Sequence, residues 1–224
     1  MIATSDALAG DKVSTRERIL EVAERMFADQ GYHGVSLRGI TAAAHANMAS
    51  VHYYFGTKQA LLKAIFEARV GPVSAERRCL LDKVLHQAGD NPPPVRDVLA
   101  AFIGPGMRLG RTPAGATFNR LSAICSVDPD PAVKDIVFGV HDDVARPFAQ
   151  ALRRACPHVD EGEFFLRLQC VFGSMMYIRA DNGRVGRLLD EQDQTARSDV
   201  DASLEQLLDF LSAGLQAPAH GKPG

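Results

Sequence analysis

The chain has 224 residues, of which 46% are hydrophobic and 23% are charged. A chain of this length can bury a sizeable core and can form one large domain or two smaller ones. The formal net charge of −2 excludes a strongly basic protein, so any contact with nucleic acid must depend on where the positive charges lie.

The cysteine pattern argues against a protein held together by disulfides or by a metal, and the hydropathy pattern argues against a membrane protein. Cys79, Cys125, Cys156 and Cys170 lie far apart without a C-x-x-C pair, which favours free thiols over a metal site or a disulfide framework. No apolar run lacks charge for long enough to span a bilayer, and the first residues carry no apolar h-region. We therefore expect a soluble cytoplasmic protein with no membrane contact, no cofactor and no metal.

The first predicted helix follows a lead-in, residues 1–13, that we expect to be flexible. Ser14 and Glu17 match a capping box, in which each residue satisfies a backbone amide of the other. Apolar residues then recur at helical spacing as far as Gln30. Gly31 is expected to end this helix, since glycine is favoured just beyond helix C-termini.

Two short helices joined by a brief turn are predicted next. Ser36 can cap the first, over residues 37–44, and Asn47 can cap the second, which runs through Phe55. His45 and the following alanine form the turn. Two short helices with little apolar surface to bury are typical of a helix-turn-helix, whose second helix enters the DNA major groove.

Four motifs between residues 15 and 70 occur in a fixed order: ERIL, A-x-x-M-F, V-S-L-R-x-I and Y-Y-F-x-T-K-x-A-L. In these motifs the chain resembles the TetR family of bacterial one-component transcriptional repressors. The resemblance implies an all-α protein. Its three-helix DNA-binding domain with the helix-turn-helix would span residues 14–56, a larger helical ligand-binding and dimerisation domain 57–216, and a flexible tail 217–224. It also implies a homodimer that a ligand releases from a palindromic DNA operator.

Nine residues are candidates for contact with double-stranded DNA. The stretch 31–70 carries four cations against one carboxylate, although such a balance is common in proteins. The resemblance places Ser36 and Lys58 at phosphates, which position a protein without specifying a sequence. Other side chains of the second helix can hydrogen-bond base edges or touch a thymine methyl. The candidates are Ser36, Arg38, Asn47, Met48, Ala49, Ser50, His52, Tyr53 and Lys58.

Prolines interrupt three later helical patterns. Pro72 is expected to kink or break a helix, Pro105 to interrupt one, and Pro147 to kink one. The glycine-rich run 104–110 lacks the spacing and the preceding strand of a phosphate loop, so we interpret it as part of an interrupted helix. The composition of residues 88–94 is typical of a linker.

The last third of the chain predicts a helix over residues 131–155, then two strongly apolar helices at about 164–180 and 199–215. Residues 181–197 are polar and are expected to form a loop. The resemblance implies that the last two helices form a four-helix bundle with a partner subunit; a closed monomeric bundle is the alternative. No alternating strand pattern occurs, which supports the all-α class.

Aromatic and thioether side chains between residues 95 and 180 can line an apolar pocket, although each can equally be core. The order of residues in this range resembles the PsrA-type branch of the TetR family, which responds to long-chain fatty acids. The resemblance implies a fatty acid, an acyl-CoA or another apolar effector, with Arg120 or Arg179 meeting a carboxylate. Either arginine can instead form a surface ion pair. The pocket candidates are Phe102, Met107, Phe118, Leu121, Phe138, Phe148, Phe172, Met175, Met176 and Tyr177.

Other classes of function are also compatible with an all-helical chain. A protein-interaction module would leave the helix-turn-helix residues unused. An activator without small-molecule release would leave the pocket unused. An enzyme would need a nucleophile with a base, or a metal cluster. The histidines are scattered, and the one cluster, His141 with Asp142 and Asp143, is better explained as a solvated helix face. We therefore predict no catalytic and no metal site.

Overall fold

The computed structural model describes residues 14–180, 182–190 and 199–218, and in these ranges all regular secondary structure is helical. The predicted all-α class is confirmed. The predicted lead-in, residues 1–13, lies outside the described residues. The helices are α1 (Thr15–Gly34), α2 (Leu37–Ala43), α3 (Met48–Tyr54), α4 (Lys58–Ala88), α5 (Val95–Leu109), α6 (Pro113–Ser126), α7 (Pro131–Ala155), α8 (Glu161–Ala180), α9 (Arg184–Leu188) and α10 (Val200–Gln216).

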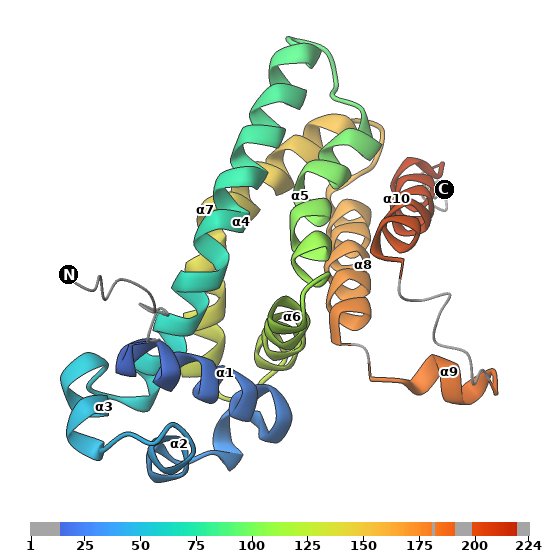
Figure 1. Ribbon diagram of the computed structural model, residues 1–224. Helices are drawn as coiled ribbons and strands as arrows, with labels where there is room; N and C mark the ends of the chain where they lie inside the picture. The colour runs from blue at the N-terminus through green and yellow to red at the C-terminus, as the bar shows by residue number, and fades with distance from the viewer. Residues whose placement is uncertain (1–13, 181, 191–198, 219–224) are drawn as a thin grey trace, which may run out of the picture.

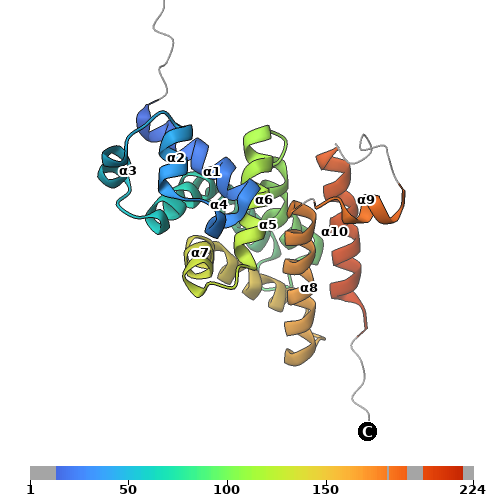
Figure 2. The ribbon, with the colours of Figure 1, turned by 90° about the horizontal axis from the view of Figure 1, so that it is seen from below.

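The long helix α4 connects two parts of the molecule (Figure 1). Helices α1, α2 and α3 gather at one end of α4. Helices α5 and α6 lie between α4 and the pair α8 and α10, which form the opposite side of the molecule (Figure 2). The short three-helix group is therefore remote from α10.

The helix starts of the N-terminal part are set by local sequence. The Ser14 side chain accepts a hydrogen bond from the Glu17 amide at 3.1 Å, and the Glu17 carboxylate accepts one from the Ser14 amide at 2.8 Å. This confirms the predicted capping box. Thr57 caps α4 in the same way. Gly31 has φ of +73° and interrupts α1, as expected of the residue that tolerates this conformation, but one more turn follows before the helix ends at Gly34.

The three prolines do not break their helices. Helix α4 continues through Pro72 and α5 through Pro105, so a break at either proline is wrong. Helix α7 also continues through Pro147, where the expected kink stays a prediction. A proline removes one backbone hydrogen bond, and burial of the flanking turns can offset that loss. Around Pro72 these turns carry Val70 and Ser74, which are almost fully buried. The predicted linker, in contrast, is confirmed, because α4 ends at Ala88 and α5 begins at Val95.

Two apolar cores share the long helices. The first core packs α1, α2 and α3 against the first half of α4 and against α6 and α7, with Phe27, Phe66 and Phe118 fully buried. The second core packs the second half of α4 against α5, α7, α8 and α10 around Phe148 and Leu208. Since α4 contributes to both cores, the domain boundary expected at residue 56 stays a prediction.

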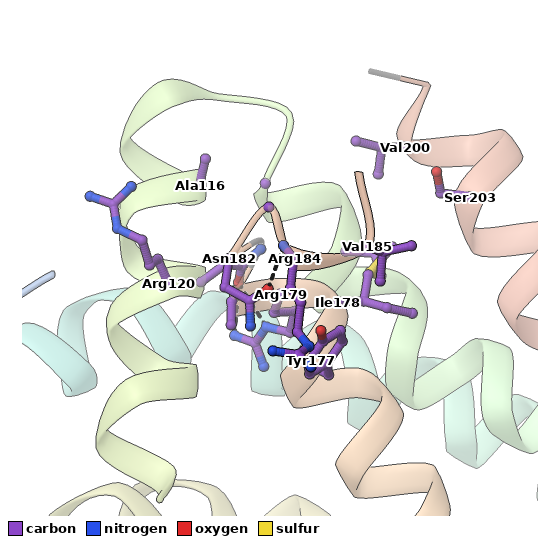
Figure 3. A pocket seen from close by; sticks show the side chains of 15 residues that line it. Ala116, Arg120, Tyr177, Ile178, Arg179, Asn182, Arg184, Val185, Val200 and Ser203 are labelled. Atoms are coloured by element: carbon purple, nitrogen blue, oxygen red, sulfur yellow. Dashed lines mark hydrogen bonds between the residues drawn. The ribbon is translucent and has the colours of Figure 1, made fainter. Parts of the chain in front are cut away.

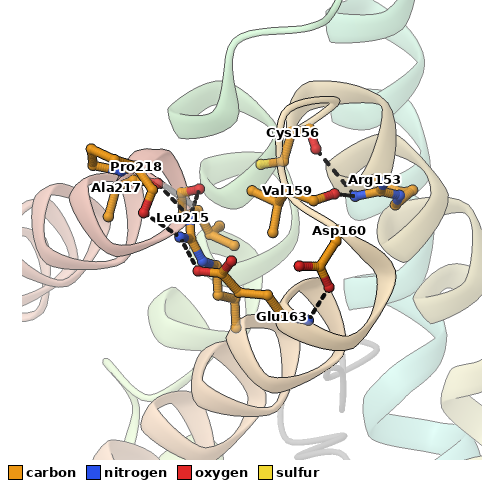
Figure 4. Close-up of polar contacts among 9 residues, drawn as sticks. Arg153, Cys156, Val159, Asp160, Glu163, Leu215, Ala217 and Pro218 are labelled. Carbon is orange, nitrogen blue, oxygen red and sulfur yellow. Dashed lines mark hydrogen bonds and ion pairs between the residues drawn. The ribbon is translucent and has the colours of Figure 1, made fainter. Parts of the chain in front are cut away.

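Two arginines fix the turn between α7 and α8 and the end of α10 (Figure 4). Arg153 donates to the carbonyls of Cys156 and Val159, at 3.1 and 2.7 Å. Arg167 donates to the carbonyls of Leu215 and Ala217, at 2.7 and 2.9 Å. The first residues of the tail expected at 217–224 are therefore held against α8, while residues 219–224 lie outside the described part.

The last helices differ from their predicted bounds at two places. Helix α8 begins at Glu161, three residues earlier than expected, because the Asp160 side chain caps it by accepting from the Glu163 amide at 3.0 Å. The stretch expected to be a loop contains α9, Arg184–Leu188, which is too short for helical periodicity to reveal. None of the helices within the described ranges combines the length and hydropathy needed to cross a membrane.

Candidate nucleic-acid interface and ligand cavity

Helices α2 and α3 form the predicted helix-turn-helix. Ala44, Val51 and Phe55 are buried and hold the two helices against α1 and α4. His45 takes φ of +47° in the turn between them, a conformation rare for residues other than glycine. The outer side of α3 remains open to solvent: the Tyr53 side chain is 83% exposed and His52 is exposed. A rigid short helix thus presents polar side chains outward.

Two of the predicted DNA contacts serve as helix caps. The Ser36 hydroxyl accepts from the Gly39 amide at 3.1 Å, and the Asn47 side chain accepts from the Ser50 amide at 2.7 Å. The Ser50 hydroxyl also donates to Asn47, at 2.9 Å. These bonds use the oxygen acceptors, whereas the Ser36 hydroxyl proton and the Asn47 amide protons stay available to phosphate oxygens.

His52 has a defined orientation on α3. Its Nδ1 lies 3.0 Å from the Gly56 carbonyl oxygen. A carbonyl oxygen only accepts hydrogen bonds, so Nδ1 carries the proton and the Nε2 of a neutral ring is an acceptor. In a major groove such an acceptor matches the amino groups of cytosine or adenine.

Lys58 and Met48 contact protein rather than extending freely. The Lys58 Nζ lies 4.2 Å from the centre of the Tyr32 ring, and burial lowers the pKa of Lys58 below its ordinary value. The Met48 sulfur lies 3.8 Å from the Thr41 hydroxyl of α2. Arg38 and Ala49, in contrast, are exposed. The roles of all nine residues at DNA stay predictions.

A second candidate site is a cavity of about 890 Å³ between α4, α5, α6, α7 and α8. Its volume lies within the range of roughly 300–1,000 Å³ that holds small organic ligands. Its walls are mainly apolar. Six of the ten predicted pocket residues line it: Phe102, Phe138, Phe172, Met175, Met176 and Tyr177.

The other four predicted pocket residues lie elsewhere. Phe118, Leu121 and Phe148 are at most 1% exposed and do not line this cavity, because they fill the contacts between helices. Phe148, for example, stacks on Phe102 with ring centres 4.0 Å apart. Met107 faces a separate cavity of about 460 Å³ next to α9 and α10. Phe118, Leu121 and Phe148 are therefore core residues, and Met107 lines the smaller cavity, rather than the larger cavity in which the other six candidates lie.

The smaller cavity adjoins the larger one at Arg179, which lines both. Figure 3 shows the Arg179 and Arg184 side chains beside Tyr177, while the Arg120 guanidinium is directed away from them. Arg120 forms an ion pair with Asp29 of α1 and donates to the Ala28 carbonyl. Arg120 therefore forms the surface ion pair that was the alternative to a role in ligand binding, whereas Arg179 forms no ion pair with any residue that the structure describes.

Two polar residues of the larger cavity, Arg77 and His141, did not stand out as pocket candidates in the sequence. Arg77 continues the buried stripe of α4 through Phe66 and Val70, and an arginine on such a stripe is the signal that could have identified it. The sequence predicts a solvated helix face for His141. The structure instead lets its Nδ1 donate to the Val137 carbonyl, at 2.8 Å, and places the ring on the cavity wall.

His141 makes folding stability depend on pH. Burial lowers its pKa to about 4, with the charges of Arg77 and Arg179 acting in the same direction. Between about pH 6.5 and 4 the unfolded chain binds a proton that the folded chain does not, so stability falls as pH falls through this window. We expect a loss of at most about 3 kcal/mol from this residue.

The measurement is the free energy of unfolding by denaturant at pH 7 and pH 4.5. The loss between the two values should be smaller by about 2 kcal/mol in His141→Gln than in the unaltered chain. His86→Gln, at an exposed histidine of α4, is the control and should retain the full loss. An equal loss in all three proteins would contradict the burial of a neutral His141.

Two family models match this chain, and together they cover both parts of the molecule. Residues 19–65 match a model described as bacterial regulatory proteins, tetR family. Residues 100–214, more than half of the chain, match one described as tetracyclin repressor-like, C-terminal domain. The chain belongs to the TetR family. Both models describe regulatory proteins, so the predicted family is confirmed, as is the prediction that the chain is not an enzyme.

Curated relatives match only part of this chain. The transcriptional repressor AcnR of Corynebacterium glutamicum is 36% identical over 72 residues, which cover 30% of this chain and 38% of AcnR. Across the curated relatives it matches, the chain spans only 25% to 38% of their length. These matches therefore show likeness over less than a third of this chain.

Solved TetR-type structures match over nearly the whole chain. FadR of Bacillus halodurans, a regulator of fatty acid degradation, has a TM-score of 0.62 at 16% identity, covering 92% of this chain and 98% of FadR. FadR of Bacillus subtilis in complex with stearoyl-CoA has a TM-score of 0.58 at 16% identity, covering 88% of this chain and 97% of that one. At such identities the likeness establishes the fold alone.

Proposed function

We propose that the chain is a homodimeric transcriptional repressor that binds a palindromic DNA operator and is released by a small apolar effector. The observation that carries this proposal is the exposed face of α3, where His52 and Tyr53 project from a capped and well-packed helix-turn-helix. Ser36 and Lys58 flank this face at the starts of α2 and α4. Base contacts from α3 and phosphate contacts from its neighbours are the usual division of work in this motif.

Exposed apolar side chains on α8 and α10 support a homodimer. Phe165 and Leu166 on α8 are 64% and 60% exposed, and Phe210 on α10 is 71% exposed. Both helices lie at the side of the molecule away from α3 (Figure 2). Exposed apolar surface of this kind marks an interaction site. A second copy packed there would form the four-helix bundle expected of residues 164–180 and 199–215 and leave both α3 helices free.

The cavity between α4 and α8 supports a small-molecule effector. Its wall is mostly apolar, with Phe102, Phe172 and Met175 among the lining residues. The similar FadR of Bacillus subtilis was crystallised with stearoyl-CoA. A fatty acid, an acyl-CoA or another apolar molecule would shift the dimer towards a conformation with lower DNA affinity.

The test is footprinting of the purified, ligand-free protein on the intergenic DNA upstream of its own gene, at two salt concentrations. We expect protection of a palindrome whose half-sites lie one helical turn, about 34 Å, apart, because a dimer places two recognition helices in successive major grooves. Binding should weaken as salt rises, since phosphate contacts release counterions.

Sedimentation analysis of the same sample provides the control. We expect a particle of twice the 24.2 kDa chain. A stable dimer that protects no DNA would count against the repressor function and favour a protein-interaction module. A monomer at micromolar concentration would contradict the proposed use of α8 and α10.

A further inference from the structure

The larger cavity contains two buried guanidinium groups. Arg77 is 3% exposed and Arg179 is 8% exposed. The Arg77 Nε donates to the Phe102 carbonyl at 2.7 Å, and the guanidinium stacks on the Phe102 ring at 4.2 Å. Arg179 donates from Nε and Nη2 to the Asn119 side-chain oxygen, at 3.0 and 2.7 Å. Both cations are thus oriented by neutral groups.

No carboxylate of the described residues forms an ion pair with either arginine. The nearby acids are engaged elsewhere: Glu76 pairs with Arg108 at 2.7 Å, and Asp142 pairs with Arg146 at 3.1 Å. An uncompensated buried charge costs several kcal/mol, and here two like charges lie on one cavity wall. Burial lowers the pKa of both groups, and the charge of Arg179 adds to this for Arg77. An anion in the cavity would remove this cost.

Both arginines retain hydrogen-bond donors for such an anion. A guanidinium has five N–H groups; within the described residues the bonds above use one N–H of Arg77 and two of Arg179. Gly106 makes room for the first, because a Cβ there would lie 2.9 Å from the Arg77 Nη2. A carboxylate, with two oxygens in one plane, fits this donor set best.

The exposed part of the cavity wall is mainly apolar, although Asp142 and Asn182 also belong to it. Val127, Phe138 and Tyr177 are 76%, 47% and 45% exposed and line the same cavity as the buried arginines. The cavity therefore combines a buried cationic region with an apolar region that reaches solvent. A ligand with one charged end can match it in a single orientation, with the charge inside.

We propose that the effector is a free carboxylic acid with an apolar tail, bound with its carboxylate at Arg77 and Arg179 and its tail towards Val127, Phe138 and Tyr177. This inference rests on the proposed function and names the effector class. It excludes a CoA thioester, because the large phosphate-bearing group of CoA cannot occupy the buried region. The reverse orientation would leave an uncharged tail against both guanidinium groups.

The experiment measures binding to the full-length protein by calorimetry, with straight-chain carboxylic acids of increasing length. The best-bound acid is then compared with the primary alcohol and the CoA thioester of the same chain. We expect the acid to bind about 10- to 100-fold more tightly than the alcohol, since charged hydrogen bonds contribute about 1.5–3 kcal/mol. The thioester should bind more weakly than the acid.

Variants locate the effect. Arg77→Met and Arg179→Met should each weaken acid binding at least tenfold while leaving alcohol binding nearly unchanged. Arg146→Met, which removes an exposed arginine outside the cavity, is the control and should bind the acid normally. Ligand-free Arg77→Met should unfold at the same temperature as the unaltered chain or higher, because it loses an uncompensated buried charge.

The inference is overturned if the alcohol or the thioester binds as tightly as the acid, or if no acid binds. It is also overturned if Arg77→Met and Arg179→Met bind the acid normally. The footprint remains a separate measurement: a protected palindrome together with any of these results would retain the DNA-binding function and reject only the acid effector. Loss of the footprint would reject the DNA-binding function itself.

Discussion

Gly115→Ala is expected to destabilise the fold by about 3 kcal/mol or more, a loss at or above the upper end of the usual cost of overpacking. A Cβ at this position would lie 1.8 Å from the Leu109 carbonyl oxygen and 2.6 Å from its carbon. These are backbone atoms at the end of α5, so no side-chain rotation can relieve the contact. The turn between α5 and α6 would have to open, and with it the Thr112 cap that accepts from the Gly115 amide at 3.0 Å.

Gly139→Ala provides the matched control for the same change of residue. Gly139 lies inside α7, where a Cβ would meet no atom within 4 Å. Alanine is the better helix former, and this variant should be more stable by about 0.5–1 kcal/mol. Denaturant unfolding of both variants gives the two free energies. A loss below about 1 kcal/mol for Gly115→Ala would show that the α5–α6 turn adapts more easily than its geometry implies.

The double variant His52→Ala, Tyr53→Ala is expected to lose about 100-fold or more in affinity for the operator, since each good base or phosphate contact contributes about 1–3 kcal/mol. Both side chains are exposed, and His52 bonds within the described residues only to the Gly56 carbonyl. Folding should therefore be unaffected. Binding to unrelated DNA should change far less, because it depends on phosphate contacts.

Gel-shift titration with operator and unrelated DNA measures both affinities. The control is His86→Ala, Gln87→Ala, two exposed residues near the other end of α4, which should bind the operator normally. A double variant at His52 and Tyr53 that retains the operator affinity within about threefold would remove α3 as the recognition helix, because that ratio is under 1 kcal/mol.

The sequence predicted those parts of the molecule that depend on neighbours within one helical turn. The caps at Ser14, Ser36 and Asn47 each use a side chain and an amide three residues later, and all are present as predicted. The helix-turn-helix follows from these caps and from the burial of Val51 and Phe55. The family likewise followed from the motifs within residues 15–70, because these resemble the motifs of the TetR family.

The pocket was predictable only in part. Phe102, Phe172 and Met175 line the cavity as expected, whereas Phe118 and Phe148, of the same residue type and on equally apolar helices, fill helix contacts. Residue type and helical spacing identify the buried side of a helix. They do not tell which buried residues face an opposing helix and which face empty space.

The sequence by itself determined the all-α class and the helix-turn-helix, because short-range capping and helical periodicity specify them, and its motifs identified the family through their resemblance to the TetR family. Only the tertiary structure decided that α4, α5 and α7 continue through their prolines, since packing of the flanking turns offsets a lost backbone hydrogen bond. It also decided that Arg120 pairs with Asp29. Arg77 and Arg179, by contrast, line one cavity and form no ion pair with a carboxylate of the described residues, since Asp142 of the same cavity pairs with Arg146. Such pairings join residues far apart in the chain, and no local pattern determines them.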